Sequence, residues 1–285
     1  MVVNGRADLH THTNASDGTG EPAGNVRLAK AAGLAAVAVT DHDTVAGVAE
    51  AVAEGERLGI TVVPGVEVST VAEGRDIHIL GYYTNLSDKA WLQRLRSLRG
   101  VRGVRNGMMV ERLRELGLAV SMEEVLEAAG KDGRGERTVG RPHIAAVLVA
   151  KGYVSSMEEA FERYLASGAA AYVNPPRITP FQAIEWIHEA GGAAVIAHPG
   201  LYGADGLVEE LLRCGADGIE VFHSDHGPEE ESRYGAMADK FGVIATGGSD
   251  YHGKRNGVVF HGELGSRTVD ASVIARLESV SRGRA

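Results

Sequence analysis

Short apolar runs rich in valine, alanine and isoleucine recur along the chain, and most are followed by a longer segment with helical apolar spacing. An apolar run of this length, bounded by glycine or polar residues, is typical of a buried strand in a parallel sheet. The strands expected on this basis span residues 2–9, 34–40, 60–68, 77–82, 193–198, 218–222 and the first part of 243–252.

Amphipathic segments separate most of these expected strands. Pro22 opens the first helix, while Gly33 and Gly59 follow the first and second helices as stop signals. Strands that alternate with helices predict a parallel sheet, and about seven such units favour a closed or nearly closed barrel over an open sheet. The helices expected around the sheet span residues 22–32, 45–58, 180–190, 207–212, 229–241 and 271–281.

The pattern changes in residues 86–169, which have a helical texture, many arginines and glutamates, and no convincing strand. A glycine-rich stretch at residues 130–137 predicts a flexible break, and Ser121 opens a capping-box sequence. The helices expected in this block span residues 101–116, 121–129, a segment that begins at 140–143, and 156–165. We interpret residues 86–169 as a helical insertion or cap, and assign residues 1–85 and 170–285 to the barrel.

Two histidines end the first expected strand with one residue between them, at positions 10 and 12. Side chains two apart on an extended strand point the same way, so His10 and His12 can both reach one ion. Neutral imidazole is the commonest ligand of transition metals in proteins. An isolated pair of this kind is more often a surface feature, so the metal interpretation depends on the rest of the chain.

Histidines and carboxylates recur at the other expected strand ends, where functional residues of parallel barrels collect. Chance would scatter them over both ends of the barrel and over the helices. His188, in an expected helix, and His261, in a polar tail, illustrate what unselected histidines look like in this chain. The residues at or just after expected strand ends, with one in the loop after the first strand, are His10, His12, Asp17, His42, Glu67, His78, His198, Asp250 and His252.

Six histidines and three carboxylates exceed the roughly four to six ligands that one divalent ion takes. The set therefore suits two or three ions, with a carboxylate such as Glu67 bridging. Three divalent ions against three carboxylates leave a charge of about +3, which a bridging hydroxide lowers to about +2. That excess matches a phosphate dianion and would let a chain with a formal net charge of −9 bind an anionic substrate.

Composition narrows the classes of function further. The chain has 285 residues, of which 44% are hydrophobic and 24% charged, as in an ordinary globular α/β domain with or without an insertion. Its acidic balance predicts no general attraction to nucleic acid or anionic membranes. With Cys214 as the single cysteine, no intrachain disulfide forms and a reducing cytoplasm is expected. No signal peptide or membrane-spanning run is evident, and no stable protein partner is predicted.

Several short motifs, in order between residues 8 and 252, resemble those of the PHP family (polymerase and histidinol phosphatase domains). They are His10-Thr11-His12, Thr40-Asp41-His42, Gly65-Val66-Glu67-Val68-Ser69, His78, Ala197-His198-Pro199 and Gly248-Ser249-Asp250-Tyr251-His252. The helical block with Gly140-Arg141-Pro142-His143 resembles one branch more closely, the nucleotide 3′,5′-bisphosphate phosphatases, some of which also act as 5′-to-3′ exoribonucleases on short RNA. The resemblance implies a distorted (β/α)7 barrel, here with a helical insertion (cap) domain, that holds a trinuclear metal site.

The resemblance also implies which side chains hold the ions. It gives the ligands as His10, His12, Glu67 and Asp250 for the first ion, Glu67, His78 and His198 for the second, and Asp17, His42 and His252 for the third. Asp41 is expected to orient a ligand and not to bind an ion. We expect two or three divalent ions, with manganese first and iron or zinc as alternatives, because mixed nitrogen and oxygen sites accept all three.

Four residues are candidates for contact with the substrate. Arg141 comes first, because its planar guanidinium suits two phosphate oxygens, but a surface arginine at a helix start is equally open. His143 could donate a hydrogen bond to phosphate or protonate the leaving oxygen, and an exposed helical histidine is the alternative. Tyr172 and His226 are weaker candidates, and packing is the more usual role for Tyr172. His223 lies near the site in sequence but is not assigned.

The expected activity is metal-dependent hydrolysis of a phosphomonoester, in which a hydroxide that bridges two ions attacks phosphorus in line. The substrate implied by the resemblance is the 3′-phosphate of adenosine 3′,5′-bisphosphate, which leaves AMP. Exoribonuclease action on short RNA, histidinol phosphatase activity and a non-enzymatic, vestigial PHP module that binds a polymerase remain as alternatives. Arginines of the helical block could line an RNA path, although a solvated helix face is the expected location for Arg94, Arg96, Arg99, Arg102, Arg105 and Arg112.

Overall fold

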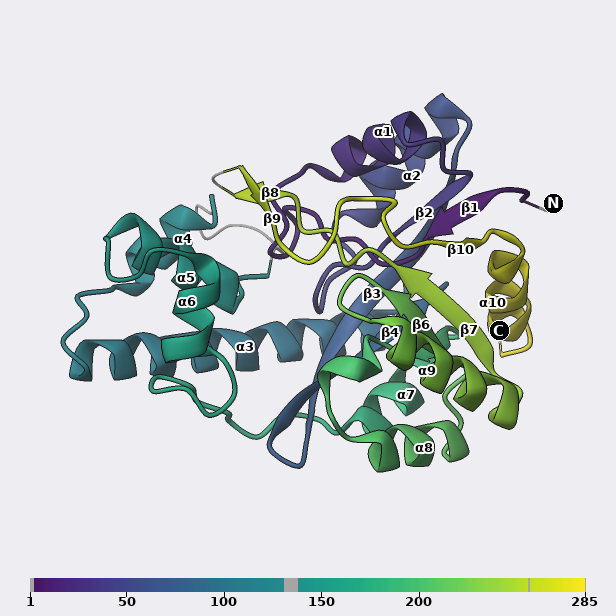
Figure 1. Ribbon diagram of the computed structural model, residues 1–285. Helices are drawn as coiled ribbons and strands as arrows, with labels where there is room; N and C mark the ends of the chain where they lie inside the picture. Colours follow the sequence, from purple (N-terminus) through teal and green to yellow (C-terminus); the bar gives the residue numbers. More distant parts are fainter. Residues whose placement is uncertain (1–2, 131–137, 256, 285) are drawn as a thin grey trace.

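A single eight-stranded sheet organises the chain (Figure 1), in a computed structural model that describes residues 3–130, 138–255 and 257–284. Its strand order is β10-β1-β2-β3-β4-β5-β6-β7. The strands are β1 (Arg6–Asp8), β2 (Ala36–Val39), β3 (Thr61–Ala72), β4 (Arg75–Tyr82), β5 (Ala193–Ile196), β6 (Gly218–His223), β7 (Ile244–Gly248) and β10 (Val269–Asp270). The N–H of Leu9 donates to the carbonyl of Gly247 at 3.1 Å, so β1 meets β7 and the barrel is nearly closed.

The expectation of a wholly parallel sheet is wrong for two strands. β4 runs antiparallel to both β3 and β5, and β10 runs antiparallel to β1. Only Glu73 and Gly74 separate β3 from β4, and both have positive φ, which is the geometry of a tight hairpin. A parallel connection would need a crossover of about a dozen residues or more. The sheet is therefore mixed, and the expected count of seven βα units is not confirmed.

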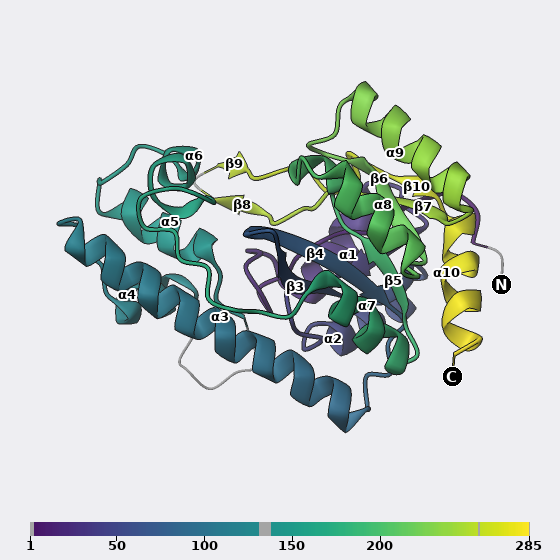
Figure 2. The same cartoon turned by 90° about the horizontal axis from the view of Figure 1, so that it is seen from below.

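The helices around the sheet follow the expected pattern closely. They are α1 (Pro22–Ala31), α2 (Val48–Leu58), α7 (Pro180–Glu189), α8 (Asp205–Arg213), α9 (Pro228–Phe241) and α10 (Ser272–Arg282). Proline occupies the first turn of α1, α7 and α9, and left-handed glycines follow α2 and α9, as the capping rules predict. Helices α1 and α2 lie beside β1 and β2, whereas α7, α8 and α9 lie beside β5, β6 and β7 (Figures 1 and 2).

The middle of the chain forms a helical group beside the barrel (Figures 1 and 2). It contains α3 (Lys89–Glu115), α4 (Met122–Ala128), α5 (Arg141–Ala150), α6 (Met157–Ala160) and a π-helical turn at Phe161–Leu165. The segment expected as a helix at 101–116 is the second half of the 27-residue helix α3. Trp91 and Leu95, near the start of α3, pack in the barrel core, whereas Met109 and Leu113 pack in a separate core with α4 and α5.

One helix therefore joins two hydrophobic cores, although the boundaries assigned to the insertion stay a prediction. Most of the expected break at 130–137 lies outside the described residues, as does the start of the strand expected at 2–9. The two-stranded sheet of β8 (Lys254–Arg255) and β9 (Val258–Val259) lies between the insertion and the barrel (Figures 1 and 2). Within the described part of the chain, none of the helices combines the length and apolar character needed to cross a membrane.

Candidate metal centre

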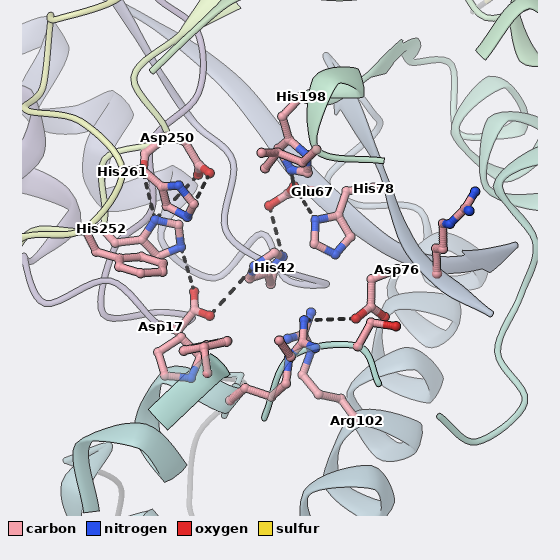
Figure 3. Close-up of a pocket in the computed structure, with 18 of the residues that line it drawn as sticks. Asp17, His42, Glu67, Asp76, His78, Arg102, His198, Asp250, His252 and His261 are labelled. Carbon is pink, nitrogen blue, oxygen red and sulfur yellow. Dashed lines mark hydrogen bonds and ion pairs between the residues drawn. The ribbon is translucent and has the colours of Figure 1, made fainter. Parts of the chain in front are cut away.

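The nine ligand candidates converge at one end of the barrel, around a cavity of about 520 Å³, and Figure 3 labels those that line the cavity. Seven of them line the cavity directly. The other two, His10 and His12, lie beneath it and are fully buried. Side chains from seven separate segments of the chain therefore meet at the place that the sequence pattern predicted.

Glu67 is the centre of this cluster, and it is almost completely buried. Its Oε1 atom lies 2.8 Å from His78 Nδ1 and 3.0 Å from His198 Nε2. Its Oε2 atom lies 3.0 Å from His42 Nδ1, 3.1 Å from His12 Nε2 and 3.5 Å from His10 Nε2. A single carboxylate with two faces thus contacts five imidazoles, which is the arrangement expected of a group that bridges two cations.

Glu67 and His78 reach the cluster in a way that differs from the expectation. Both were expected at strand ends, but Glu67 lies within β3 and His78 within the first half of β4. Because β4 runs antiparallel to β3, with His78 opposite Ser69, the first half of β4 lies at the same end of the barrel as Glu67. The hairpin therefore adds a ligand group without an extra βα unit.

Asp250 and Asp17 contact the histidines on the other side of the cluster. Asp250 Oδ1 lies 3.1 Å from His12 Nε2 and 3.4 Å from His10 Nε2. Asp17 Oδ1 lies 3.4 Å from His252 Nε2, and its Oδ2 lies 3.7 Å from His42 Nε2. Asp250 has a φ of 52°, an uncommon backbone conformation for a non-glycine residue, and such strained positions concentrate at functional sites.

The cluster fits divalent cations by geometry as well as by residue type. Ligand atoms about 2.1 Å from an ion lie roughly 3.0–3.4 Å from one another in octahedral or tetrahedral shells, which matches most of the separations above. Among the described residues, His10 Nε2, His12 Nε2, His42 Nδ1 and Asp250 Oδ1 are buried without a hydrogen-bond partner. Several groups of three or four side chains could each hold an ion, including His12-Asp17-His42-His252 and His10-His12-Glu67. How ligands divide among ions stays a prediction.

The pKa values of the cluster also favour bound divalent cations. Burial alone would lower the pKa of His12, but the adjacent carboxylates of Asp250 and Glu67 raise this pKa to about 10. Burial would raise the pKa of Glu67, but the charges of His42, His78 and His10 lower it well below its usual value. The carboxylates are therefore ionised and draw positive charge toward the cluster, which is the charge that divalent cations supply.

Two buried carboxylates, of which the sequence analysis had selected only Asp41, contact the ligand candidates or the loop that carries Asp17. Both oxygens of Glu220 lie within 3.2 Å of His10 Nδ1, and Oε2 accepts the backbone N–H of His198 at 2.8 Å. Asp41 accepts hydrogen bonds from Thr13 and Ser16 in the loop that carries Asp17. This contact agrees with the orienting role expected for Asp41. An acidic residue inside an apolar strand, as at position 220, was the sequence signal for such a role.

His261 corrects one expectation. The sequence pattern places it in a polar tail as an unselected histidine, but it lines the cavity, with Nδ1 2.5 Å from Asp225 Oδ2 and Nε2 3.5 Å from Asp250 Oδ2. His223, which was not assigned, is fully buried with Nε2 3.4 Å from Asp250 Oδ2. Figure 3 shows His261 beside Asp250 and His252. His188 does lie in a helix, α7, where it pairs with Asp217 at 2.9 Å.

Of the four substrate candidates, only Arg141 lines the cavity. Its guanidinium lies 2.9 Å from Asp76 Oδ2 and over the rings of Phe161 and Tyr172. His143 is buried and not exposed, and its Nδ1 accepts the N–H of Gly140 in a helix cap. Tyr172 lies beside Arg141 and Asp76, outside the lining.

His226 contacts the backbone through both ring nitrogens. Its Nε2 accepts the N–H of Gly200 at 3.1 Å, and its Nδ1 donates to the carbonyl of Val221 at 2.9 Å. These two bonds place His226 in the scaffold behind the cavity, where it is buried.

Two arginines of α3 also differ from the expectation of a solvated helix face. Arg102 is 6% exposed and Arg105 is 2% exposed, and both line the cavity. Arg102 contacts Ser69 and lies 3.2 Å from Asp43 Oδ2 through its Nε. Arg112, near the end of the same helix, is exposed as expected. Helix α3 therefore turns one set of guanidinium groups toward the metal cluster and another toward solvent.

Comparison with known proteins places this site in a family. A model of the PHP domain matches residues 8–166. The chain is 37% identical over 252 residues to the 5′-3′ exoribonuclease Rnm of Escherichia coli, covering 86% of this chain and 84% of that protein. It is 35% identical over 264 residues to the 3′,5′-nucleoside bisphosphate phosphatase of Chromobacterium violaceum, covering 88% of each.

A solved structure shows the same fold. A predicted metal-dependent phosphoesterase from Bifidobacterium adolescentis superposes with a TM-score of 0.87 at 32% identity, and the match covers 96% of each chain. The family model spans more than half of the chain, and the relatives match along most of their length. The expectation of a metal-dependent phosphoric ester hydrolase is therefore confirmed. This chain belongs to the PHP domain family and is a metal-dependent phosphoesterase.

Proposed function

We propose that this phosphoesterase hydrolyses the 3′-phosphate of nucleoside 3′,5′-bisphosphates and converts adenosine 3′,5′-bisphosphate to AMP. The observation that carries the proposal is that one cavity holds both the imidazole and carboxylate cluster and the guanidinium of Arg141. The imidazole and carboxylate cluster suits a reacting phosphate, and the Arg141 guanidinium suits an anionic group on the same substrate. The relative from Chromobacterium violaceum, which is named for this activity, supports the same substrate class.

Separate groups of the protein would bind the metal ions and the phosphate oxygens. The nine ligand candidates would hold two or three divalent ions, with manganese first. When bound, the ions supply positive charge that polarises the phosphoryl group and lowers the pKa of water, so no side-chain nucleophile is needed. Arg141 would hold phosphate oxygens through its planar fork. Asp76 Oδ2 lies 2.9 Å from Arg141 Nη2, so the guanidinium is oriented before the substrate enters.

The cavity also offers an apolar surface for a base. Phe161 and Phe260 both line it, and their ring centroids lie 5.9 Å apart in a stacked arrangement. Phe161 belongs to the π-helical turn of the insertion, and Phe260 follows β9. Bases stack on aromatic side chains regardless of sequence, at about 1–3 kcal/mol per base. A nucleotide thus finds groups for its phosphates and for its base in the same cavity.

The test is phosphate release with manganese from adenosine 3′,5′-bisphosphate and from histidinol phosphate. We expect release from the bisphosphate and little from histidinol phosphate. Asp250→Asn should abolish turnover, because it removes a charge that contacts His10 and His12. Arg141→Ala should raise KM by about tenfold or more, the cost of a charged hydrogen bond. Preference for histidinol phosphate would contradict the substrate class, and wild-type kinetics in Arg141→Ala would remove Arg141 from the site.

A second candidate is 5′-to-3′ exoribonuclease action on short RNA at the same cluster. The specific observation in its favour is the pair of buried arginines on α3, because cationic groups along a groove suit a nucleic-acid backbone. The similarity to the Escherichia coli exoribonuclease supports it as well. Stepwise shortening of a 3′-labelled oligonucleotide under the same conditions would demonstrate this activity, and an intact oligonucleotide beside rapid hydrolysis of the bisphosphate would reject it.

A further inference from the structure

His261 lies between the aromatic surface of the cavity and the metal cluster. Its ring centroid is 4.3 Å from that of Phe260 and 5.4 Å from that of His252. Its Nε2 atom is 3.5 Å from Asp250 Oδ2, and Figure 3 shows His261 beside Asp250 and His252. A molecule that reaches from Phe260 to the cluster therefore lies against His261.

Asp225 fixes the orientation of the His261 ring. His261 Nδ1 lies 2.5 Å from Asp225 Oδ2, and this hydrogen bond lowers the pKa of Asp225 below its usual value. The carboxylate is therefore ionised and accepts, so Nδ1 of His261 donates. The opposite nitrogen, Nε2, faces Asp250 at a separation longer than that of a normal hydrogen bond. Nε2 thus keeps hydrogen-bonding capacity for a ligand.

The backbone and the exposure of His261 also suit contact with a ligand. Its φ is 63°, an uncommon value for a residue other than glycine, and such positions concentrate at functional sites. Its side chain is 18% exposed, so a molecule in the cavity can reach it. The neighbouring His223 is fully buried and offers no such access.

The order of groups along the cavity matches the parts of a nucleotide. Phe260 offers a surface for the base, and the metal cluster suits the scissile 3′-phosphate, so the ribose that joins them lies beside His261. The 2′-hydroxyl of that ribose is on the carbon next to the one that carries the 3′-phosphate. A hydroxyl both donates and accepts, so it can pair with Nε2 whether or not this nitrogen carries a proton.

We infer that His261 binds the 2′-hydroxyl of the substrate and makes the enzyme selective for ribonucleotides over 2′-deoxyribonucleotides. This inference rests on the proposed function, because it places the 3′-phosphate at the metal cluster. A 2′-deoxy substrate leaves Nε2 without its partner, and a site built to hydrogen-bond a hydroxyl rejects the analogue that lacks it.

The test compares adenosine 3′,5′-bisphosphate with its 2′-deoxy analogue, with manganese present. The wild-type ratio of their kcat/KM values should favour the ribonucleotide by about threefold to tenfold, the range of one neutral hydrogen bond. His261→Ala should bring this ratio close to one. His261→Gln, whose amide can still bond a hydroxyl, should keep part of it. His188→Ala, which changes a histidine of α7 outside the cavity lining, should leave the ratio unchanged.

Equal kcat/KM values for the two substrates in the wild type would overturn the inference, and so would an unchanged ratio in a folded His261→Ala protein. Melting curves show whether each variant is folded. Manganese titration by calorimetry separates selectivity from metal binding. We expect the same number of manganese ions in His261→Ala as in the wild type, and the loss of one would make His261 a metal ligand and contradict the proposed contact.

If the wild type releases phosphate from neither bisphosphate, the proposed function fails and binding decides the inference separately. The probes are adenosine 3′-monophosphate and its 2′-deoxy analogue, titrated by calorimetry into manganese-loaded protein. Tighter binding of the ribonucleotide by about threefold or more, lost in His261→Ala, supports the contact. Equal affinities in the wild type, or no binding of either nucleotide, contradict it.

Discussion

At the scale of single residues, the site depends on carboxylates that do not face the cavity as much as on the groups that do. Glu220 contacts His10 Nδ1 with both oxygens, so the opposite ring nitrogen faces Glu67 and Asp250. It also accepts the N–H of His198. Partners of this kind fix the tautomer and orientation of a metal-binding histidine. Two ligand candidates that follow different strands are thereby held by one buried side chain.

Glu220→Gln should therefore weaken metal binding while the fold persists. A glutamine keeps the size of the side chain but loses the charge that favours a proton on His10 Nδ1. We expect the dissociation constant for manganese to rise about tenfold to a hundredfold, the usual cost of such a substitution. Manganese titration by calorimetry measures it, with the exposed Glu229→Gln as the matched control. Identical titrations for Glu220→Gln and the wild type would show that Glu220 has no part in holding the ligands.

Some residues of the site could not be predicted from the sequence pattern. Seven of the nine ligand candidates lie after strand ends, where the end of a buried apolar run is visible in the sequence, whereas Glu67 and His78 lie within strands. His261 was missed, since the loop after β9 has no periodic pattern to show that it folds back onto Asp250. Arg105 was missed because its neighbours on α3 include exposed arginines, and the sequence alone does not separate the two faces of a helix this rich in arginine.

At the scale of elements, strand direction decides which residues share the cavity. The turn at Glu73 and Gly74 reverses β4 and carries His78 back to the cluster. The alternating pattern predicted the strands and helices well, but strand direction depends on connection length, and a two-residue hairpin was not weighed against a crossover. Helix α3 was predicted only in part for a related reason. Its two halves pack in different cores, so its apolar residues do not form one continuous stripe.

The contact between β7 and the segment after β1 gives a prediction at this scale. A Cβ added at Gly248 would overlap the backbone nitrogen and the Cβ of His10, which cannot move without shifting a ligand candidate. Gly248→Ala should destabilise the fold by about 1–3 kcal/mol, as overpacking does, and should lower metal content. Thermal melting and metal analysis measure both effects. Gly206→Ala, in α8 with open space around it, is the matched control and should melt at or above the wild-type temperature.

If Gly248→Ala melts like the wild type and binds the same amount of metal, the segment after β1 adapts to the added methyl group. The close packing of β7 against His10 would then be no constraint on the site.

At the scale of the whole molecule, a nearly closed barrel supplies a rigid cluster of imidazoles and carboxylates, and an insertion supplies guanidinium groups across the same cavity. The barrel and its helices were predictable, because alternating apolar runs are a local property of the sequence. The meeting of the insertion with the barrel was not, since it depends on how α3 spans two cores. On the proposed function, the two halves of the cavity together would explain how a chain with a formal net charge of −9 binds a nucleotide with two phosphate groups.

The most direct test of the account is phosphate release from adenosine 3′,5′-bisphosphate as manganese is returned to metal-depleted protein. The account predicts no release from the depleted protein and recovery that saturates as manganese fills the cluster, with no recovery in Asp250→Asn. Release that continues undiminished in the presence of a chelator, or no release at any manganese concentration, would contradict it.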